Sequence, residues 1–412
     1  MRTYEPLSDE VQNNPYPTYE WLREEAPIYF HEGMRSWVIS RHSDCLRVLR
    51  DHTVFASDAR RADDAAVSDN PSLQGLDPPQ HTPLRQLFRA LLTDLDFIAV
   101  ERRAFEISAG QVAGAAEAGL GYDFVADVAR PAALAVMSEL IGVRPPDVVE
   151  FSHLVDAIER GMDAGLVPEA ATGAGEAREG FARLIDGWRT AHEPRGFVAR
   201  LLRADIGDQV TDTSVWNSLR VFFLAGYSST AAAAANSALV LAAEPRLQEQ
   251  AADALAQEGG ATTCVDELMR YESPIQAAGR SVVADTELHG VTMRRGDSVV
   301  VLIGAANRDP ARFAEPDRVR LHRPRGQHLA FGWGVHACTG TLIAKAAVAG
   351  ILRGLLSSGS FRIDGQMHRQ RRATVRYPAV LPLRHERDDR LPSGLVPVGG
   401  GAAEMREEDG RA

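Results

Sequence analysis

The chain has 412 residues, 45% of them hydrophobic and 25% charged, which is the composition of a globular protein with enough apolar surface for a large core. Its 56 acidic residues outnumber 45 basic ones, and the net charge of −11 argues against a nucleic-acid or anionic-membrane surface. The cysteines, Cys45, Cys264 and Cys338, are far apart and lack Cys-x-x-Cys spacing, which argues against a disulfide framework or a zinc knuckle.

Helical patterns dominate the first part of the chain and are interrupted by two short strands. We expect an amphipathic helix at residues 17–25, strands at 28–30 and 37–40, and a helix at 43–50. Residues 58–76 are polar, rich in Asp, Ala, Ser and Gly, and have no apolar period. A loop of this length is typical of a functional lid or a disordered segment.

Further helices are predicted in the middle of the chain. Helical periodicity resumes at residues 79–92 and continues through 101–118 and 125–141. Glycine and proline residues at 142–146 and 161–175 predict turns between the helices that follow.

The longest predicted element is a helix from residue 213 to about residue 243, with Thr213 or Ser214 as its expected N-cap. Roughly 30 residues that rise 1.5 Å each span about 45 Å, so this helix must run through the middle of the protein. Short alternating strands follow residue 285. The predicted fold is therefore mainly α with small β-sheets, in one domain over residues 1–385.

The two ends of the chain carry separate expectations. No basic region followed by an apolar core opens the sequence, and no stretch of about 18 uncharged apolar residues occurs, so we expect a cytoplasmic protein that does not span a membrane. Residues 386–412 are charged and rich in Gly and Pro. They have little to bury, so we expect a disordered tail.

The residues around Cys338 carry the strongest local signal. Gly332 and Gly334 permit positive φ and a close approach to a flat, bulky group, and a further glycine follows at Gly340. An apolar helical run starts directly afterwards, so helix N–H groups and the helix dipole should stabilise a Cys338 thiolate. Such a thiolate suits an iron porphyrin, with His336 beside a haem propionate. The alternative is a buried cysteine beside a glycine turn.

This loop resembles the haem-binding signature of the cytochrome P450 family, Phe-x-x-Gly-x-His/Arg-x-Cys-x-Gly. The matching residues are Phe331, Gly334, His336, Cys338 and Gly340. The resemblance extends from about residue 14 to residue 382. It implies the cytochrome P450 fold with its long central helix, haem b (iron protoporphyrin IX), and Cys338 as the axial iron ligand.

Thr339 departs from the family pattern, which has an apolar residue beside the ligand. Donors around a metal ligand tune the metal, so we expect the Thr339 hydroxyl to form a hydrogen bond near the sulfur and raise the redox potential.

Further motifs match the family in order and spacing. His81 and Arg85 are spaced i, i+4, and Arg280 follows residues 271–275; the resemblance implies that all three bind haem propionates. A buried dianionic cofactor needs such partners, because unpaired buried carboxylates are costly. The alternative for His81 and Arg85 is two solvated polar residues.

Glu267 and Arg270 place an acid and a base three positions apart, on one face of a helix. Taken alone, they would be a surface ion pair that contributes about a few tenths of a kcal/mol. The resemblance implies instead a buried structural pair behind the haem that is locked to Arg323.

The central helix contains a polar cluster in an apolar setting, and the resemblance makes this cluster the oxygen-binding groove. The family pattern Ala-Gly-x-Asp/Glu-Thr-Thr/Ser matches Ala225, Gly226, Ser228, Ser229 and Thr230, with Ser228 in place of the acid and Ser229 in place of the threonine. Gly226 is expected to leave room for a ligand. The alternative is that the hydroxyls bond to carbonyls of their own helix.

The missing acid leaves two reactions open. The family's acid–alcohol pair delivers protons to the oxygen side of the haem, and general-acid help is typically worth ~10²–10⁴ in rate. Ser228 cannot relay protons as a carboxylate does, so water or a substrate group would have to serve. We expect a monooxygenase that hydroxylates or O-demethylates a small natural-product or aromatic molecule, with oxidative coupling or desaturation as the alternative.

Partners follow from what the chain lacks. No flavin or ferredoxin domain is fused to it, so we expect a separate ferredoxin and ferredoxin reductase, with dioxygen and a small molecule as substrates. A basic run is the expected ferredoxin-docking patch, although such a run is usually a solvated face. It comprises Arg318, Arg320, His322, Arg323, Arg325 and His328.

The substrate's charge and two non-enzymatic roles also stay open. Arg60, Arg61, Arg371 and Arg372 are candidates to meet an acidic substrate, with exposed arginines as the alternative. A haem-fold scaffold or partner activator is one non-enzymatic role, but the ligand cysteine is present here. A helical binding module without a cofactor leaves the order of the four separated motifs unexplained.

Overall fold

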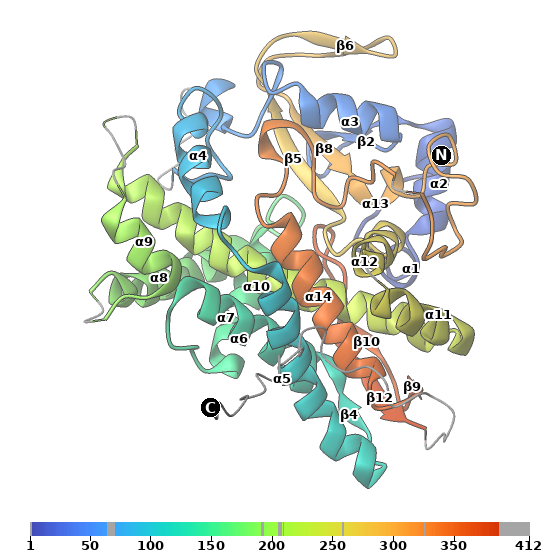
Figure 1. Ribbon diagram of the computed structural model, residues 1–412. Helices are drawn as coiled ribbons and strands as arrows, with labels where there is room; N and C mark the ends of the chain where they lie inside the picture. Colours follow the sequence, from blue (N-terminus) through green and yellow to red (C-terminus); the bar gives the residue numbers. More distant parts are fainter. Residues whose placement is uncertain are drawn as a thin grey trace, which may run out of the picture.

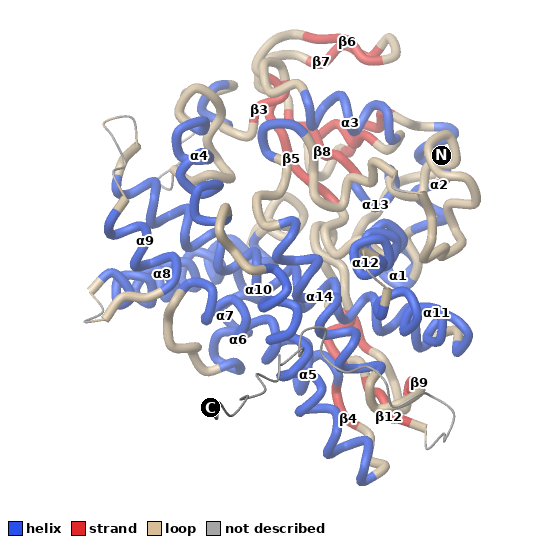
Figure 2. Tube along the Cα trace, viewed as in Figure 1, coloured by secondary structure: helices blue, strands red, loops and turns tan. Residues whose placement is uncertain are grey.

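The computed structural model describes residues 2–63, 71–190, 193–204, 208, 210–257, 259–324 and 326–386. Helices form most of this part of the chain and surround small sheets (Figures 1 and 2). The helices are α1 (Asp9–Asn13), α2 (Tyr16–Glu25), α3 (His42–Arg50), α4 (His81–Leu92), α5 (Phe97–Ala118), α6 (Arg130–Ile141), α7 (Val148–Gly161), α8 (Ala170–Arg189), α9 (Gly196–Arg203), α10 (Asp212–Ala242), α11 (Pro245–Ala256), α12 (Gly260–Tyr271), α13 (Ile303–Ala306) and α14 (Thr341–Leu356).

The strands are short and belong to four sheets. They are β1 (Ile28–His31), β2 (Ser36–Ile39), β3 (Phe55–Ala56), β4 (Tyr122–Asp123), β5 (Ala277–Val282), β6 (Thr286–Leu288), β7 (Val291–Met293), β8 (Ser298–Leu302), β9 (Phe361–Ile363), β10 (His368–Arg369), β11 (Pro378–Val380) and β12 (Pro382–His385). The expected fold class, mainly helical with small sheets, is confirmed.

The largest sheet joins the start of the chain to its last third. Its strand order is β1-β2-β8-β5-β3, in which β2 and β8 are parallel and the other neighbours are antiparallel. Val38 of β2 and Val299 of β8 are fully buried in this sheet. Helix α3 lies beside it (Figure 1).

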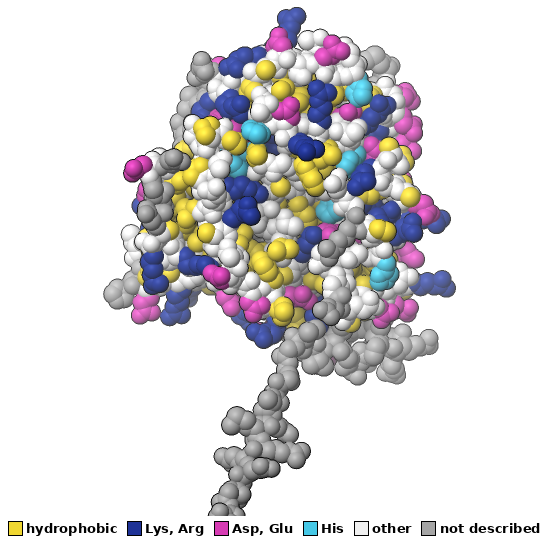
Figure 3. Space-filling view, turned by 45° about the horizontal axis from the view of Figure 1, so that its top comes forward, with side chains coloured by type: hydrophobic (Ala, Val, Ile, Leu, Met, Phe, Trp, Pro, Cys, Tyr) yellow, Lys and Arg dark blue, Asp and Glu magenta, His cyan; other side chains and the backbone are white. Residues whose placement is uncertain are grey.

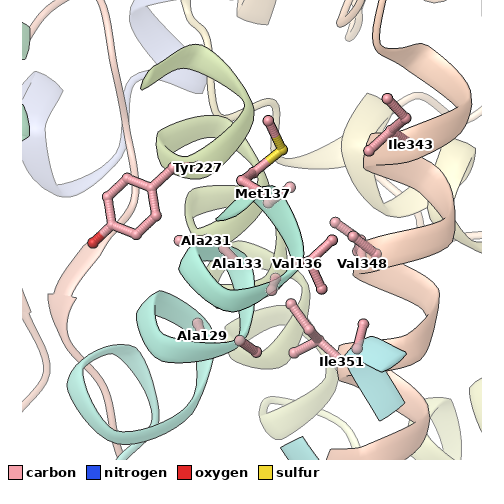
Figure 4. Packing of buried hydrophobic residues seen from close by; sticks show 14 of the residues in the cluster. Ala129, Ala133, Val136, Met137, Tyr227, Ala231, Ile343, Val348 and Ile351 are labelled. Atoms are coloured by element: carbon pink, nitrogen blue, oxygen red, sulfur yellow. The ribbon is translucent and has the colours of Figure 1, made fainter. Parts of the chain in front are cut away.

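Helix α10 is the long central helix that the sequence predicts. Its 31 residues correspond to about 46 Å at 1.5 Å per residue. It packs against α6 and α14, where small side chains let the three helices approach closely. Figure 4 shows this core, which includes Ala129, Ala133, Val136, Met137, Tyr227, Ala231, Ile343, Val348 and Ile351.

The predicted N-cap of α10 is wrong. Thr211 caps the helix, and its hydroxyl accepts a hydrogen bond from the backbone N–H of Ser214 at 3.1 Å. The Ser214 hydroxyl itself donates to the Thr211 carbonyl. The helix starts earlier than predicted. Asp212 lies in its first turn, where its negative charge interacts favourably with the positive end of the helix dipole.

The turn predicted over residues 161–175 is shorter in the structure. Helix α7 ends at Gly161, but α8 begins at Ala170 and contains Gly173 and Gly175. A Cβ on Gly161 would lie 2.2 Å from Cβ of Ala174, so the missing side chain allows α7 and α8 to pack closely.

Two expectations meet the limits of the described residues. Most of the tail predicted to be disordered, from residue 387 onward, lies outside them, as does part of the predicted loop at residues 64–70. Within them, no helix combines the length and the apolar character that crossing a membrane requires.

Candidate active site

The Cys338 loop folds into a compact turn in front of α14. The Cys338 N–H donates to the Phe331 carbonyl at 2.8 Å. Gly332 and Gly334 adopt φ of 65° and 74°, which a side chain would disfavour. A Cβ on Gly334 would also lie only 2.7 Å from the Leu49 carbonyl oxygen of α3, so glycine is required there for close packing.

The Cys338 residue is exposed, whereas Cys45 and Cys264 are buried. Protein groups packed around the loop reduce the hydration of the thiol, and this loss of hydration raises the thiol pKa. The Gly340 N–H, the Thr341 hydroxyl and the charge of Arg85 act in the opposite direction. These three groups favour the thiolate, as expected at a helix N-terminus, but do not outweigh the loss of hydration. The iron of a bound porphyrin would favour the thiolate further.

Two threonine hydroxyls lie close to Cys338. Thr339 accepts a hydrogen bond from Arg85 Nη1 at 3.3 Å. Thr341 donates to the Cys338 carbonyl at 2.9 Å and counters the rise in the Cys338 pKa. The sequence held a signal for it, because a threonine three residues after the cysteine opens the helical run.

His81 and Arg85 both reach the Cys338 loop from α4. The Arg85 guanidinium donates to the Ala337 carbonyl at 2.8 Å. The His81 ring lies 4.7 Å from the His336 ring, and its Nε2 is buried without a hydrogen-bond partner. Burial, followed by the charges of His336 and Arg85, lowers the pKa of His81 to about 4. The orphaned nitrogen marks a position where a bound group would supply the missing partner.

His336, the expected neighbour of a propionate, contacts a carboxylate of the protein. Its Nε2 lies 2.7 Å from Oδ1 of Asp77, a residue that the sequence reasoning missed. Asp77 is buried, accepts the Asp58 N–H and pairs with Arg61 at 3.2 Å. Burial opposes its ionisation, but the donors around it, His336 first, hold the pKa of Asp77 far below its usual range. Its only sequence signal is its position just ahead of the proline pair that precedes α4.

Arg280 lies on β5, opposite Val299 of β8. Its guanidinium donates to the carbonyl of Gly279 at 2.7 Å. Burial lowers the pKa of Arg280, and the negative charge of Asp77 opposes that shift. An exposed thiol, an orphaned imidazole nitrogen and a desolvated arginine together fit a flat iron complex with anionic arms, so the residues present match a haem.

One face of α10 is open toward the Cys338 loop. Ala225 is exposed and Phe222 and Ser229 are half-buried, although most neighbouring residues of α10 are buried. Residues spaced by three, four and seven share a helix face, so these three side chains point the same way. Phe222 lies 3.9 Å, and the Cys338 sulfur 4.0 Å, from the position that a Cβ on Gly340 would occupy. The structure thus places this face of α10 beside the cysteine.

Gly226 does not leave the free space that was expected. A Cβ on Gly226 would lie 2.4 Å from Cε of Met137, so the α6 side chain fills that space (Figure 4). Thr230 is buried on another side of the helix. Of the predicted groove residues, Ala225 and Ser229 are the ones that face the opening.

Ser228 contacts a carboxylate that the sequence reasoning missed. Its hydroxyl donates to Oε1 of Glu159 on α7, and both side chains are buried. The contact joins residues that are 69 positions apart in the chain. No local pattern signals it, since Glu159 lies in an ordinary amphipathic helix.

The structure brings Glu267, Arg270 and Arg323 together in the interior. Glu267 pairs with Arg270 at 2.8 Å and with Arg323 at 2.9 Å, and the three side chains are 2%, 2% and 9% exposed. The backbone N–H of Arg320 also donates to Glu267 at 2.8 Å. One carboxylate thus ties α12 to the segment that leads into the Cys338 loop.

The predicted basic docking patch is not supported. Arg323 is buried against Glu267, and His328 pairs with Asp266 at 3.1 Å. Arg318 and Arg320 are exposed but share Glu315, whose single charge offsets one of their two. Arg325 lies outside the described residues. On the face shown in Figure 3, basic and acidic side chains are interspersed.

The arginines considered for an acidic substrate already have acidic partners. Arg60 pairs with Asp58, Arg61 with Asp77, Arg371 with Asp9, and Arg372 with Asp156 and Glu159. Because these partners neutralise the arginines, the structure does not support an acidic-substrate site built from them.

Known proteins resemble this chain over most of its length. The sequence model of the cytochrome P450 family matches residues 182–378. Cytochrome P450 monooxygenase PikC from Streptomyces venezuelae is 31% identical, covering 85% of each chain. Nocardicin C N-oxygenase from Nocardia uniformis is 30% identical, covering 86% of this chain and 90% of that protein. The solved structure of CYP109E1 from Bacillus megaterium with testosterone has a TM-score of 0.82 at 24% identity, covering 92% of this chain and all of that one.

The chain therefore belongs to the cytochrome P450 family and is a haem-dependent monooxygenase. Membership also means that it takes electrons from redox partners and acts on a substrate.

Proposed function

We propose that this monooxygenase hydroxylates or O-demethylates a small natural product with dioxygen and two electrons. The observation that carries the proposal is the exposed Cys338 thiol, which lies beside the open face of α10 that holds Ala225 and Ser229. The substrate class is supported by relatives whose names place them in such chemistry, PikC and nocardicin C N-oxygenase, at 31% and 30% identity.

The proposed cofactor is haem b, with Cys338 as the axial ligand of its iron. His81, Arg85 and Arg280 would face its propionates, and the turn with Gly332, Gly334 and Gly340 would let the loop approach the ring, with Phe331 packed beside it. The bound haem supplies the site at which dioxygen is activated. The protein's own residues hold it, exclude water and place hydroxyl groups beside it.

We expect His81→Ala and Arg280→Leu to loosen the haem. A hydrogen bond to a charged group contributes about 1.5–3 kcal/mol, so each change should speed haem loss about 10- to 100-fold. The rate is measured by transfer of haem to an excess of apomyoglobin. Thr82→Ala, at an exposed position next to His81, is the matched control and should leave the rate unchanged. Equal rates in all four proteins would remove these residues from the haem site.

Oxidative coupling or desaturation gains no support from the comparisons. That alternative rested on the absence of a carboxylate at position 228, yet the structure places Glu159 against the Ser228 hydroxyl. A scaffold role is disfavoured because the thiol of Cys338 is accessible.

Product mass decides between these reactions. Candidate natural products are first screened for spin-state shifts in the haem spectrum, and hits are then incubated with ¹⁸O₂ and a ferredoxin system. We expect a product that has gained one ¹⁸O atom, or lost a methyl group as formaldehyde. A product that has only lost hydrogen atoms would overturn the proposal in favour of coupling or desaturation.

We further propose that the protein acts in the cytoplasm and forms one haem-thiolate domain over residues 1–385. Its proposed electron donors are an acidic ferredoxin and a ferredoxin reductase. A surface hollow of about 600 Å³ reaches Thr339 and Thr341, which directly follow Cys338 in the chain. Arg89 and the half-exposed Leu342 line the same hollow. This site supports donor docking better than the basic run does, because it is next to the cysteine and Arg89 has no acidic partner among the ion pairs of the described residues.

Charge reversal tests the docking site. We expect Arg89→Glu to slow reduction of the haem by ferredoxin and to weaken its salt dependence, because steering by complementary charge is lost. Arg318→Glu, at a site already offset by Glu315, is the control and should change the rate little. Stopped-flow absorbance at several salt concentrations measures both. If Arg318→Glu slows reduction and Arg89→Glu does not, the basic run is the docking patch after all.

A further inference from the structure

Glu159 of α7 is a buried carboxylate that reaches the open part of α10. Its side chain is 1% exposed, and one of its oxygens, Oε1, accepts the hydroxyl of Ser228. Ser228 directly precedes Ser229, which lies on the face open toward Cys338. Ser228 itself is buried and its hydroxyl faces α7, so the contact brings the carboxylate to the residue next to the open face.

The other oxygen of Glu159 belongs to a balanced set of charges. Arg372 pairs with Glu159 Oε2 and, at 3.1 Å, with Asp156, which pairs with Arg130 at 2.9 Å. Two carboxylates thus face two guanidinium groups. The ion pair with Arg372 already satisfies Glu159 electrostatically, so the contact with Ser228 is not needed to neutralise it. The contact places the Oε1 carboxylate oxygen of Glu159 against α10.

Oxygen atoms continue the route on the far side of Glu159. The Tyr377 hydroxyl lies 3.3 Å from Glu159 Oε2 and 3.4 Å from Asp156 Oδ1, and it can donate to one of them at a time. The Asp156 side chain is 13% exposed and contacts the Gln370 amide at 3.3 Å. Three oxygen-bearing side chains, those of Asp156, Tyr377 and Glu159, thus link a partly exposed position to Ser228.

We propose that Glu159 is the acid that the α10 sequence lacks, and that it positions a proton for the oxygen side of the haem through the Ser228 hydroxyl. Insertion of one oxygen atom consumes dioxygen, two electrons and two protons, and the second oxygen atom leaves as water. A proton that enters from solvent at Asp156 and passes by way of Tyr377 first protonates Glu159. Glu159 then gives a proton to Ser228 as Ser228 releases its own toward Ser229 on the open face, and Glu159 returns to its ionised form paired with Arg372. This inference rests on the proposed function, which places oxygen chemistry at that face.

Moving the carboxylate tests the inference. We expect Glu159→Gln and Ser228→Ala each to lower the product formed per electron pair about 10- to 100-fold, within the usual contribution of a general acid, while hydrogen peroxide rises. Ser228→Asp combined with Glu159→Gln returns a carboxylate to α10 and should recover most of the loss. Glu150→Gln, an exposed site on the same helix, is the matched control and should stay fully coupled.

A second readout is independent of turnover. Carbon monoxide bound to the reduced protein has a stretching frequency that responds to donors and charges near it, so Glu159→Gln and Ser228→Ala should shift it and Glu150→Gln should not. Thermal unfolding shows whether Glu159→Gln has lost its fold, in which case Ser228→Ala, which leaves the ion pair intact, decides.

The outcomes separate the two proposals. Wild-type protein that forms no oxygenated product would defeat the proposed function itself. Coupled wild-type protein whose Glu159→Gln and Ser228→Ala variants keep both coupling and stretching frequency would defeat the inference alone. The inference would also fail if the folded double variant, Ser228→Asp with Glu159→Gln, recovered no product per electron pair. The loss in Glu159→Gln would then be structural.

Discussion

Cys338→Ala protein is expected to lose both turnover and the absorption spectrum that thiolate ligation gives the reduced, carbon monoxide-treated enzyme. Cys338 is the exposed cysteine, and its sulfur lies near Gly340, as Phe222 of α10 does. No other thiol among the described residues replaces it, because Cys45 and Cys264 are buried in the core. Spectra and product assays on the purified variant measure the effect.

Cys264→Ala on α12 is the control for this change. It removes a buried sulfur and costs about 1–2 kcal/mol of stability, but should leave the spectrum and turnover intact. A Cys338→Ala protein with the unaltered spectrum would show that another residue holds the iron, and the site described here would be wrong.

Glu267→Ala is expected to cause the largest loss of stability. The change leaves the guanidinium groups of Arg270 and Arg323 buried without their carboxylate. Breaking a buried pair by removing one partner typically costs about 3–5 kcal/mol. Urea unfolding of the haem-loaded protein, followed by circular dichroism, measures the free energy of unfolding.

A surface ion pair provides the matched comparison. Glu139 pairs with Arg103 at 2.9 Å, but the two side chains are 64% and 46% exposed. Exposed pairs contribute about 0–1 kcal/mol, so Glu139→Ala should change stability by no more than that. If the two alanine variants unfold at the same urea concentration, the Glu267 cluster does not stabilise the fold as its burial implies.

Features set by local sequence were predictable. The turn around Cys338 follows from its glycines and from the helical run after it, and the length of α10 follows from a continuous apolar pattern. The Glu267–Arg270 spacing likewise fixes a helical pair. The N-cap was missed by two residues because several residues that favour caps stand in a row at the start of α10.

Contacts between distant segments could not be read from the sequence. Asp77 meets His336 across 259 positions and Glu159 meets Ser228 across 69. Neither belongs to a pattern, because each depends on how whole helices pack. The same holds for Met137, which fills the space beside Gly226. The sequence thus indicated the cofactor and the helix beside it, while the acid nearest that helix emerged only from the packing of α7.

The parallel pairing of β2 with β8 has a consequence for how the chain is made. Residues 36–39 leave the ribosome early, but their partners at 298–301 follow only after most of the chain. A nascent chain that ends before β8 leaves Val38 and Ile39, both fully buried in the finished fold, on an unpaired strand edge. The β2 edge must therefore wait for the last third of the chain, and until then it is exposed to wrong strand pairing that a chaperone would prevent.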